Sequence, residues 1–293
     1  MYDIEKIYQA TSVEDAIKHL VADPDSLIIA GGSDILIKIH EGKLAGCSLV
    51  SIYGLDELRG VTLQEDGRIK IGPLTSFSHI TKDPIIQSYI PVLGDAVDEV
   101  GGPQVRNIGT IGGNISNGVT SADSASTLFA LNAELEITGP NGSKIIPIKD
   151  YYLGPGRVDL KNGELLTAIY IQKDNYENYY GCYIKYAMRD AMDIATLGCS
   201  VSCKLNHDKT HLEDVRLAYG VAGPVPMRCP ETEEAVKGMA ISETLFDVFG
   251  KTALTEVRPR DSWRASKILR LQLAEELCKR ALKEAIRRAG GEC

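Results

Sequence analysis

The chain has 293 residues, 44% of them hydrophobic and 25% charged, and a formal net charge of −8. This composition is typical of a folded protein with two domains, and its acidity excludes a surface that binds nucleic acid regardless of sequence. No run of about 18 apolar residues could span a membrane, and residues 1–5 lack the basic start of a secretory signal. We therefore expect a cytoplasmic protein.

The seven cysteines favour reduced thiols, because their number is odd and no export signal accompanies them. Only Cys199 and Cys203 lie close together, within an alternating pattern that predicts a strand. We interpret the cysteines as small buried side chains, and we expect neither an iron–sulfur cluster nor another metal in this chain.

The first 55 residues predict a small α/β unit. Ser12 is a typical helix N-cap, and the apolar positions that follow it up to Val21 have helical spacing. The uninterrupted apolar run 27–30 predicts a strand buried on both faces, and residues 49–52 predict another strand. A glycine turn at 31–32 therefore follows a strand, which is where the sheets of α/β proteins bind ligands.

Residues 56–176 predict a second unit of strands and short helices. Two hairpins are indicated by Asp66-Gly67 and Asn141-Gly142, each of which lies between two short apolar runs. Pro84 and Pro91 are expected to divide a helical region into short helices. The predicted elements are strands at 61–63, 68–71, 134–137, 144–148 and 165–171, short helices within 76–100, and a helix at 124–130.

A polar stretch at 173–178 is the expected linker to a C-terminal unit. The elements predicted there are strands at 180–188, 195–205 and 213–222 and helices at 242–257 and 266–289. The last helix has a broad apolar face, and its basic residues alternate with acidic ones as on a solvated surface. We expect an α+β protein with domains at 1–176 and 177–293, the first with subdomains of about 1–55 and 56–176, and the second with a small antiparallel sheet packed on helices.

The functional prediction depends on two glycine-rich segments, Ala30-Gly31-Gly32-Ser33-Asp34 and Gly109-Thr110-Ile111-Gly112-Gly113-Asn114. Glycine adopts positive φ at low cost, so backbone N–H groups and hydroxyls can gather around a diphosphate. Taken alone, each segment is as typical of an ordinary tight turn as of a ligand-binding loop. Neither has the Gly-x-Gly-x-x-Gly spacing of a dinucleotide fold or the Lys-Ser/Thr ending of a P-loop. A diphosphate held by both segments remains as the hypothesis.

Together with Asp123, these segments resemble the FAD-binding subunit of molybdenum hydroxylases, and the resemblance covers essentially the whole chain. It extends to the stretches 102–107, 120–124, 185–190 and 262–267, which are most similar to the medium subunit of bacterial three-subunit xanthine dehydrogenases. The resemblance implies an FAD-binding domain of the vanillyl-alcohol-oxidase (PCMH) type, built from two α/β subdomains, followed by the family's C-terminal domain.

The same resemblance implies which residues bind FAD. The two glycine-rich segments would hold the diphosphate from two sides, Asp123 would bind the adenosine portion, and Lys185 would lie near the isoalloxazine ring. The first segment contains no His or Cys to which FAD could be linked, so non-covalent FAD is expected, and Gly112→Val is expected to block its uptake. The full implied set is Ile28, Ile29, Ala30, Gly31, Gly32, Ser33, Asp34, Ile35, Gly109, Thr110, Ile111, Gly112, Gly113, Asn114, Asp123, Leu166 and Lys185.

The resemblance implies an electron-transfer subunit without catalytic side chains of its own. Electrons from substrate hydroxylation at a molybdenum-cofactor large subunit would pass through [2Fe-2S] clusters on a small subunit to this FAD and then to NAD⁺, with oxygen or another acceptor as the alternative to NAD⁺. A hetero-oligomer follows from this scheme, with a dimer of heterotrimers as one form. The alternatives are a carbon monoxide, nicotinate or aldehyde dehydrogenase subunit, a free-standing flavin oxidase, and a nucleotide-binding module without catalysis.

Three charged residues near Lys185 have two interpretations. Arg189, Asp190 and Asp193 either shape the access of nicotinamide to the flavin or form a surface ion pair worth less than about 1 kcal/mol. Tyr186 is interpreted as a core or interface residue, with a place over the flavin as the alternative. The histidines show no spacing typical of a metal site or a catalytic triad.

Overall fold

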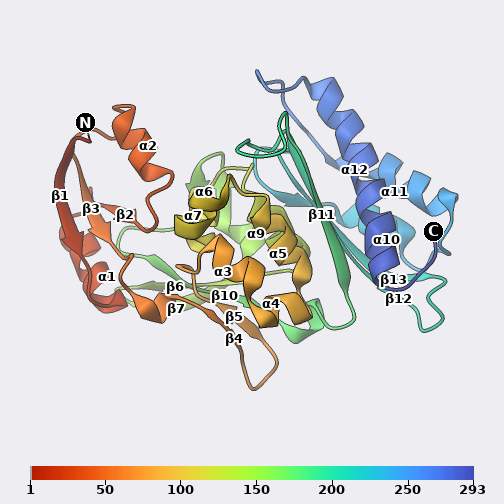
Figure 1. Ribbon diagram of the computed structural model, residues 1–293, viewed down its shortest axis with the longest axis horizontal. Helices are drawn as coiled ribbons and strands as arrows, with labels where there is room; N and C mark the ends of the chain where they lie inside the picture. The colour runs from red at the N-terminus through yellow and green to blue at the C-terminus, as the bar shows by residue number, and fades with distance from the viewer. Residues whose placement is uncertain (1) are drawn as a thin grey trace.

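Residues 2–293 are described in the computed structural model (Figure 1). Three units follow one another along the chain, and Figure 1 shows the first and the last at opposite ends of the molecule with the middle unit between them. This α+β arrangement agrees with the predicted fold class. Of the helices in these residues, none combines the length and the apolar character that a membrane crossing needs.

The N-terminal unit is a parallel three-stranded sheet with the strand order β1-β3-β2. Ser12 caps α1 by accepting a hydrogen bond from the N–H of Asp15, as predicted. β2 is a half-buried edge strand, so the prediction that both of its faces are buried is wrong, and β3 is the central strand. The elements are β1 (Ile4–Gln9), α1 (Val13–Ala22), β2 (Leu27–Ile29), α2 (Ile35–His40) and β3 (Cys47–Ser51).

The middle unit is an antiparallel five-stranded sheet with the order β4-β5-β10-β6-β7, and short helices share one apolar core with it. Both predicted hairpins are present. Pro84 and Pro91 each begin a helix, because proline lacks the N–H that an interior helical residue donates. The elements are η1 (Asp56–Leu58), β4 (Val61–Leu63), β5 (Ile69–Ile71), α3 (Phe77–Lys82), α4 (Pro84–Tyr89), α5 (Pro91–Asp98), α6 (Pro103–Ile108), α7 (Ile111–Ser116), α8 (Asp123–Ala130), β6 (Glu134–Gly139), β7 (Gly142–Pro147), α9 (Ile148–Tyr151), β8 (Tyr152–Gly154), β9 (Arg157–Val158), β10 (Leu165–Ile171) and η2 (Lys173–Asn175).

The C-terminal unit is an antiparallel four-stranded sheet with the order β11-β12-β13-β14. Its elements are β11 (Tyr180–Tyr186), β12 (Leu197–Leu205), β13 (Leu212–Gly220), β14 (Met227–Arg228), α10 (Pro230–Val236), α11 (Glu243–Glu256) and α12 (Lys267–Arg288). Along β12, Cys199 and Cys203 belong to the apolar core shared with α11 and α12, so these thiols are buried as interpreted. The alternate residues Ser200 and Ser202 face the other side of the sheet, where α8 of the middle unit lies.

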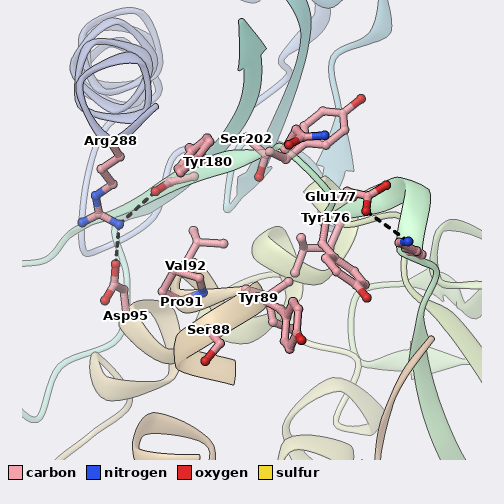
Figure 2. Close-up of a pocket in the computed structure, with 16 residues that line it drawn as sticks. Ser88, Tyr89, Pro91, Val92, Asp95, Tyr176, Glu177, Tyr180, Ser202 and Arg288 are labelled. Atoms are coloured by element: carbon pink, nitrogen blue, oxygen red, sulfur yellow. Dashed lines mark hydrogen bonds and ion pairs between the residues drawn. The ribbon is translucent and has the colours of Figure 1, made fainter. Parts of the chain in front are cut away.

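A seam between the middle and C-terminal units is bridged by charged side chains. Arg288 of α12 pairs with Asp95 of α5 at 2.7 Å and donates to the carbonyl of Gly181 at 2.9 Å. Figure 2 shows these contacts beside a cavity of about 540 Å³ that is lined by α4, α5 and the start of β11. The turn η2 lies next to this seam, and we retain a domain boundary near residue 176 as a proposal.

Candidate functional site

The first glycine-rich segment connects β2 to α2 at the carboxyl end of β2, as predicted. Gly31 lies against the end of α6, and a Cβ built on it would be 1.9 Å from the carbonyl oxygen of Ile108. Gly32 has a φ of +75°, which favours glycine. In the part of the chain that the structure describes, the N–H groups of Gly31, Gly32, Ser33 and Asp34 donate no hydrogen bond. This row of free amides is suited to an anion.

The second glycine-rich segment begins a helix, which corrects the prediction of a turn. The hydroxyl of Thr110 caps α7 by accepting a hydrogen bond from the N–H of Gly113 at 3.2 Å. The other amides of 111–114 donate to nearby backbone carbonyls at 2.8–3.1 Å. The expectation that both segments offer their amides to one anion is therefore wrong for 111–114. Thr110 is buried, and its own N–H has no acceptor among the described residues.

Gly112 is required by packing within the protein. A Cβ on Gly112 would lie 2.4 Å from the Cβ of Pro73 and 2.8 Å from the carbonyl oxygen of the same proline. Gly112→Val would therefore disturb the packing of α7 whether or not a ligand is bound, and the expected mechanism, intrusion into the diphosphate, is wrong. Gly113 is exposed, and a Cβ there would meet only the hydroxyl of Thr110, at 2.9 Å. The open side of the segment is at Gly113.

Side-chain hydrogen bonds connect the two glycine-rich segments to α8. Lys38 of α2 donates to Oδ1 of Asn117, the residue after α7, at 2.9 Å. Ser124 of α8 donates its hydroxyl to Oδ1 of Asn114 at 2.6 Å. The three stretches that contain most of the implied site residues are therefore linked into one continuous part of the molecule.

A buried ion pair joins α8 to β11. Oδ2 of Asp123 and Nζ of Lys185 are 2.9 Å apart, and only 7% and 5% of these side chains are exposed. Tyr183 donates its hydroxyl to Oδ1 of Asp123 at 2.7 Å. Lys185 also donates to the carbonyl of Glu99 at 2.8 Å. Because both carboxylate oxygens and two of the three ammonium hydrogens have partners, the two charges are held in a fixed arrangement.

The resemblance places Asp123 at the adenosine portion of FAD and Lys185 near the isoalloxazine ring. The structure brings the charged ends of these two side chains together, 2.9 Å apart. The role of each residue toward FAD stays a prediction. Leu166 on β10 is 5% exposed, and its side chain is part of the apolar core. Only the backbone of Leu166 is therefore available to contact a ligand.

The protonation of Asp123 is set by opposing effects. Burial raises its pKa to about 6, and Lys185 and the hydrogen bond from Tyr183 act in the opposite direction. Burial also raises the pKa of Tyr183 well above its ordinary value, so that this residue remains a hydrogen-bond donor. The ion pair is therefore complete above about pH 6 and loses its negative charge below it.

The raised pKa of Asp123 predicts a pH dependence of stability. Folding takes up a proton between the ordinary pKa of 3.8 and the folded value of about 6, so this carboxyl makes the folded state less stable as pH rises through that window. We expect the free energy of unfolding of the wild-type chain, relative to Asp123→Asn, to fall by about 2 kcal/mol between pH 4 and pH 6.5. Urea unfolding at several pH values measures this difference, and a difference independent of pH contradicts the assignment.

Lys185 also lines a pocket of about 420 Å³, whose other walls are Glu99 and the loop after β11. Arg189 and Asp193 form an ion pair of 3.7 Å within this loop, and both line the pocket. An ion pair between these residues and a role in shaping the access of nicotinamide are therefore compatible, because the ion pair forms part of the pocket wall. Tyr186 is 42% exposed and lines the same pocket, which excludes its interpretation as a core residue.

Sequence reasoning missed Tyr183 and Glu99. Tyr183 lies two residues before Lys185 on β11, and the alternation of side chains along a strand puts both on the same face, so this signal was available. Glu99 contributes its backbone carbonyl to the ion pair, and no side-chain pattern marks such a role. Across residues 2–293, no three His, Cys, Asp or Glu side chains come together as a metal site would require.

Known proteins match this chain over nearly its whole length. A family model described as the FAD binding domain in molybdopterin dehydrogenase matches residues 2–172, and the CO dehydrogenase flavoprotein C-terminal domain matches residues 182–285. The xanthine dehydrogenase FAD-binding subunit of Escherichia coli O157:H7 is 40% identical over 100% of this chain and 99% of its own length. The glyceraldehyde dehydrogenase medium chain of Sulfolobus acidocaldarius is 31% identical over 97% of this chain and 99% of its own.

The fold is similarly matched. A solved structure of carbon monoxide dehydrogenase from Hydrogenophaga pseudoflava, in a form that lacks the Mo-pyranopterin moiety, superposes with a TM-score of 0.92. The matched chain is 26% identical, and the match covers 98% of this chain and 99% of the other. Both units that flank the seam therefore have counterparts in a known structure.

Proposed function

Because this chain belongs to the FAD-binding subunits of the molybdopterin dehydrogenases, we propose that it carries one non-covalent FAD and passes electrons from a partner subunit to NAD⁺. We further propose that the complete enzyme is of the xanthine dehydrogenase type, on the basis of the 40% identity to such a subunit over the full length. The observation that carries the proposal is the row of free amides in the first glycine-rich segment, held in place by α6.

The residues present fit the diphosphate of FAD. Four consecutive amides at 31–34 and the buried N–H of Thr110 have no acceptor within the described chain, and phosphate oxygens are suitable acceptors for them. The two places are adjacent, because Gly31 packs against the residues that lead into Thr110. Non-covalent binding is consistent with the side chains of 28–35, which include no His or Cys.

Lys185 and Asp123 would set the electrostatics of the flavin site. FAD, when bound, supplies the hydride chemistry, and the protein orients it and adjusts its potential. The ammonium of Lys185 favours a ring that has taken up negative charge, and Asp123 offsets part of that effect because it lies 2.9 Å from the ammonium. The pocket beside Lys185 would be the route by which the electron acceptor reaches the flavin. No side chain here needs to act as acid, base or nucleophile.

The partners follow from the same proposal. We assign substrate hydroxylation to a large subunit with the molybdenum cofactor and electron relay to a small subunit with [2Fe-2S] clusters, in a heterotrimer that can pair into a dimer. The medium-chain relatives support this assignment, since such chains are subunits of larger enzymes. The substrate would be selected on the large subunit, so this chain contributes the acceptor side of the reaction.

Reconstitution with both partner subunits tests the proposed function. We expect xanthine to bleach the flavin absorbance of the purified complex under anaerobic conditions, and added NAD⁺ to restore it with formation of NADH. If xanthine bleaches the flavin and NAD⁺ does not restore its absorbance, the assignment of NAD⁺ as the electron acceptor is wrong. Bleaching by nicotinate, an aldehyde or carbon monoxide, but not by xanthine, would overturn the xanthine dehydrogenase assignment while leaving the FAD subunit role intact.

A further inference from the structure

The cavity at the seam between the middle and C-terminal units has the size of a small-molecule site. Its volume of about 540 Å³ lies within the range of about 300–1,000 Å³ that is typical of ligand pockets. Tyr180 and Gly181 line it from the start of β11, whereas Lys185 lies about 13 Å beyond Gly181 along this strand, at about 3.3 Å per residue. The cavity shares no lining residue with the pocket beside Lys185. It is therefore separate from the proposed flavin site.

A buried hydroxyl without a partner belongs to the wall of this cavity. Ser202 of β12 lines the cavity across from Ser88 and Tyr89 (Figure 2), is 1% exposed, and has no hydrogen-bond partner for its Oγ in the described chain. Ser202 pairs with Gly181 across the two strands, so both residues face the same side of the sheet. On that side, a Cβ on Gly181 would lie 2.9 Å from the Cβ of Val92, which also lines the cavity. Burial of a hydroxyl without a hydrogen bond is unfavourable, and a ligand in the cavity would supply that bond.

Aromatic rings form much of the cavity wall. The rings of Tyr89 and Tyr176 meet edge to face, with their centres 5.5 Å apart. Tyr89 and Tyr180 are 41% and 46% exposed, so part of each ring is free to contact a ligand. Aromatic rings prefer edge-to-face or offset-stacked neighbours. A planar aromatic molecule would therefore extend the cluster that these tyrosines begin.

The charged groups of the wall are paired with one another. Arg288 lies 2.7 Å from Asp95, and Lys173 lies 3.1 Å from Glu177. These four are the charged side chains of the cavity wall, so the wall has no net charge. A charged ligand of either sign would have to break one of these ion pairs or lie beside a group of its own sign. The charges therefore favour an uncharged occupant.

We propose that this cavity binds an uncharged, planar aromatic molecule with a hydrogen-bonding edge, in the class of nucleobases and aromatic amides. The ring would lie against Tyr89 and Tyr176, and its polar edge would accept a hydrogen bond from the hydroxyl of Ser202. Because the wall comes from both α5 and β11, such a ligand would hold the middle and C-terminal units together. The site is independent of the proposed function, since none of the residues assigned to FAD lines the cavity.

Isothermal titration calorimetry of the FAD-loaded chain with indole-3-carboxamide tests the class of ligand. This probe is uncharged, planar and aromatic, and indole-3-carboxylate is the matched anion. We expect indole-3-carboxamide to bind at one site and the carboxylate to bind about tenfold more weakly or not at all. Absence of binding by the carboxamide would overturn the proposal, and so would equal or tighter binding of the carboxylate.

Variants of two wall residues test the location. Ser202→Ala is expected to weaken binding of indole-3-carboxamide about fivefold, because it removes a hydrogen bond, and Tyr89→Ala about tenfold, because it removes a ring contact. Two controls, both expected to bind like the wild type, affect residues that do not line the cavity. Ser200→Ala removes another buried, unpartnered hydroxyl of β12, and Tyr53→Ala removes a ring that is 40% exposed. If the wall variants weaken binding no more than their controls, the probe binds elsewhere and the proposal is wrong.

Discussion

Lys185→Met is expected to lower the free energy of unfolding by about 3–5 kcal/mol at pH 7.5, as measured by urea unfolding of the chain without FAD. The reason is that Asp123 is 7% exposed and loses the ammonium 2.9 Å away. Its carboxyl then has to take up a proton to stay buried, and this costs more free energy as pH rises. We therefore expect a smaller loss of stability at pH 5 than at pH 7.5.

An ion pair on the surface is the matched control that distinguishes the effect of burial from the effect of losing a charge. Lys204 and Glu213 form an ion pair of 2.7 Å on the same sheet, with 32% and 50% of their side chains exposed. Lys204→Met is expected to cost less than about 1 kcal/mol, because water screens exposed charges. If Lys185→Met costs no more than Lys204→Met, or if its effect does not change with pH, the account of the buried pair is wrong.

Gly31→Ala is expected to weaken FAD binding about ten- to a hundredfold. The added Cβ would lie 1.9 Å from the carbonyl oxygen of Ile108, so the first glycine-rich segment has to move away from α6. Strain of this kind typically costs about 1–3 kcal/mol, and it appears in the affinity because FAD needs the amides of 31–34 in place. Titration of the flavin-free chain with FAD, followed by flavin fluorescence, measures the effect.

Gly42→Ala is the control for Gly31→Ala. Gly42 follows α2 in the same unit, has a φ of +77°, and a Cβ there would meet nothing within 4 Å. We expect about 1 kcal/mol lower stability from the left-handed backbone and an FAD affinity within about twofold of the wild type. Equal losses of affinity in the two variants would show that the close approach of Gly31 to Ile108 is unimportant.

The order of the elements was predictable because local signals decide it. Pro84 and Pro91 each begin a helix, because proline is favoured at the first helical position. Asp66-Gly67 forms a hairpin turn because of its own backbone preferences. The burial of β2 was not predictable in this way. A run of apolar residues predicts a strand but does not give its position in the sheet. β2 lies at the edge because β3 pairs with β1 on its other side.

The residues proposed for the candidate site come from the sequence, whereas their hydrogen bonds could not be predicted from it. Glycine at 31 and 112 signals a close approach, yet the sequence cannot say whether the neighbour is a ligand or the protein, and in both cases the nearest atoms are protein atoms. The segment 111–114 contains two glycines, which are poor helix formers, and it is helical because Thr110 caps it and Pro73 packs on it. Such contacts arise only in the folded chain.

The backbone amide resonances of the isotope-labelled chain, followed during titration with FAD, test the central claim most directly. We expect the amides of Gly31, Gly32, Ser33 and Asp34 to move strongly as phosphate oxygens accept their hydrogen bonds, while those of 111–114, already bonded within the protein, move little. If 111–114 respond and 31–34 do not, the diphosphate is bound elsewhere and the assignment of the first segment is wrong.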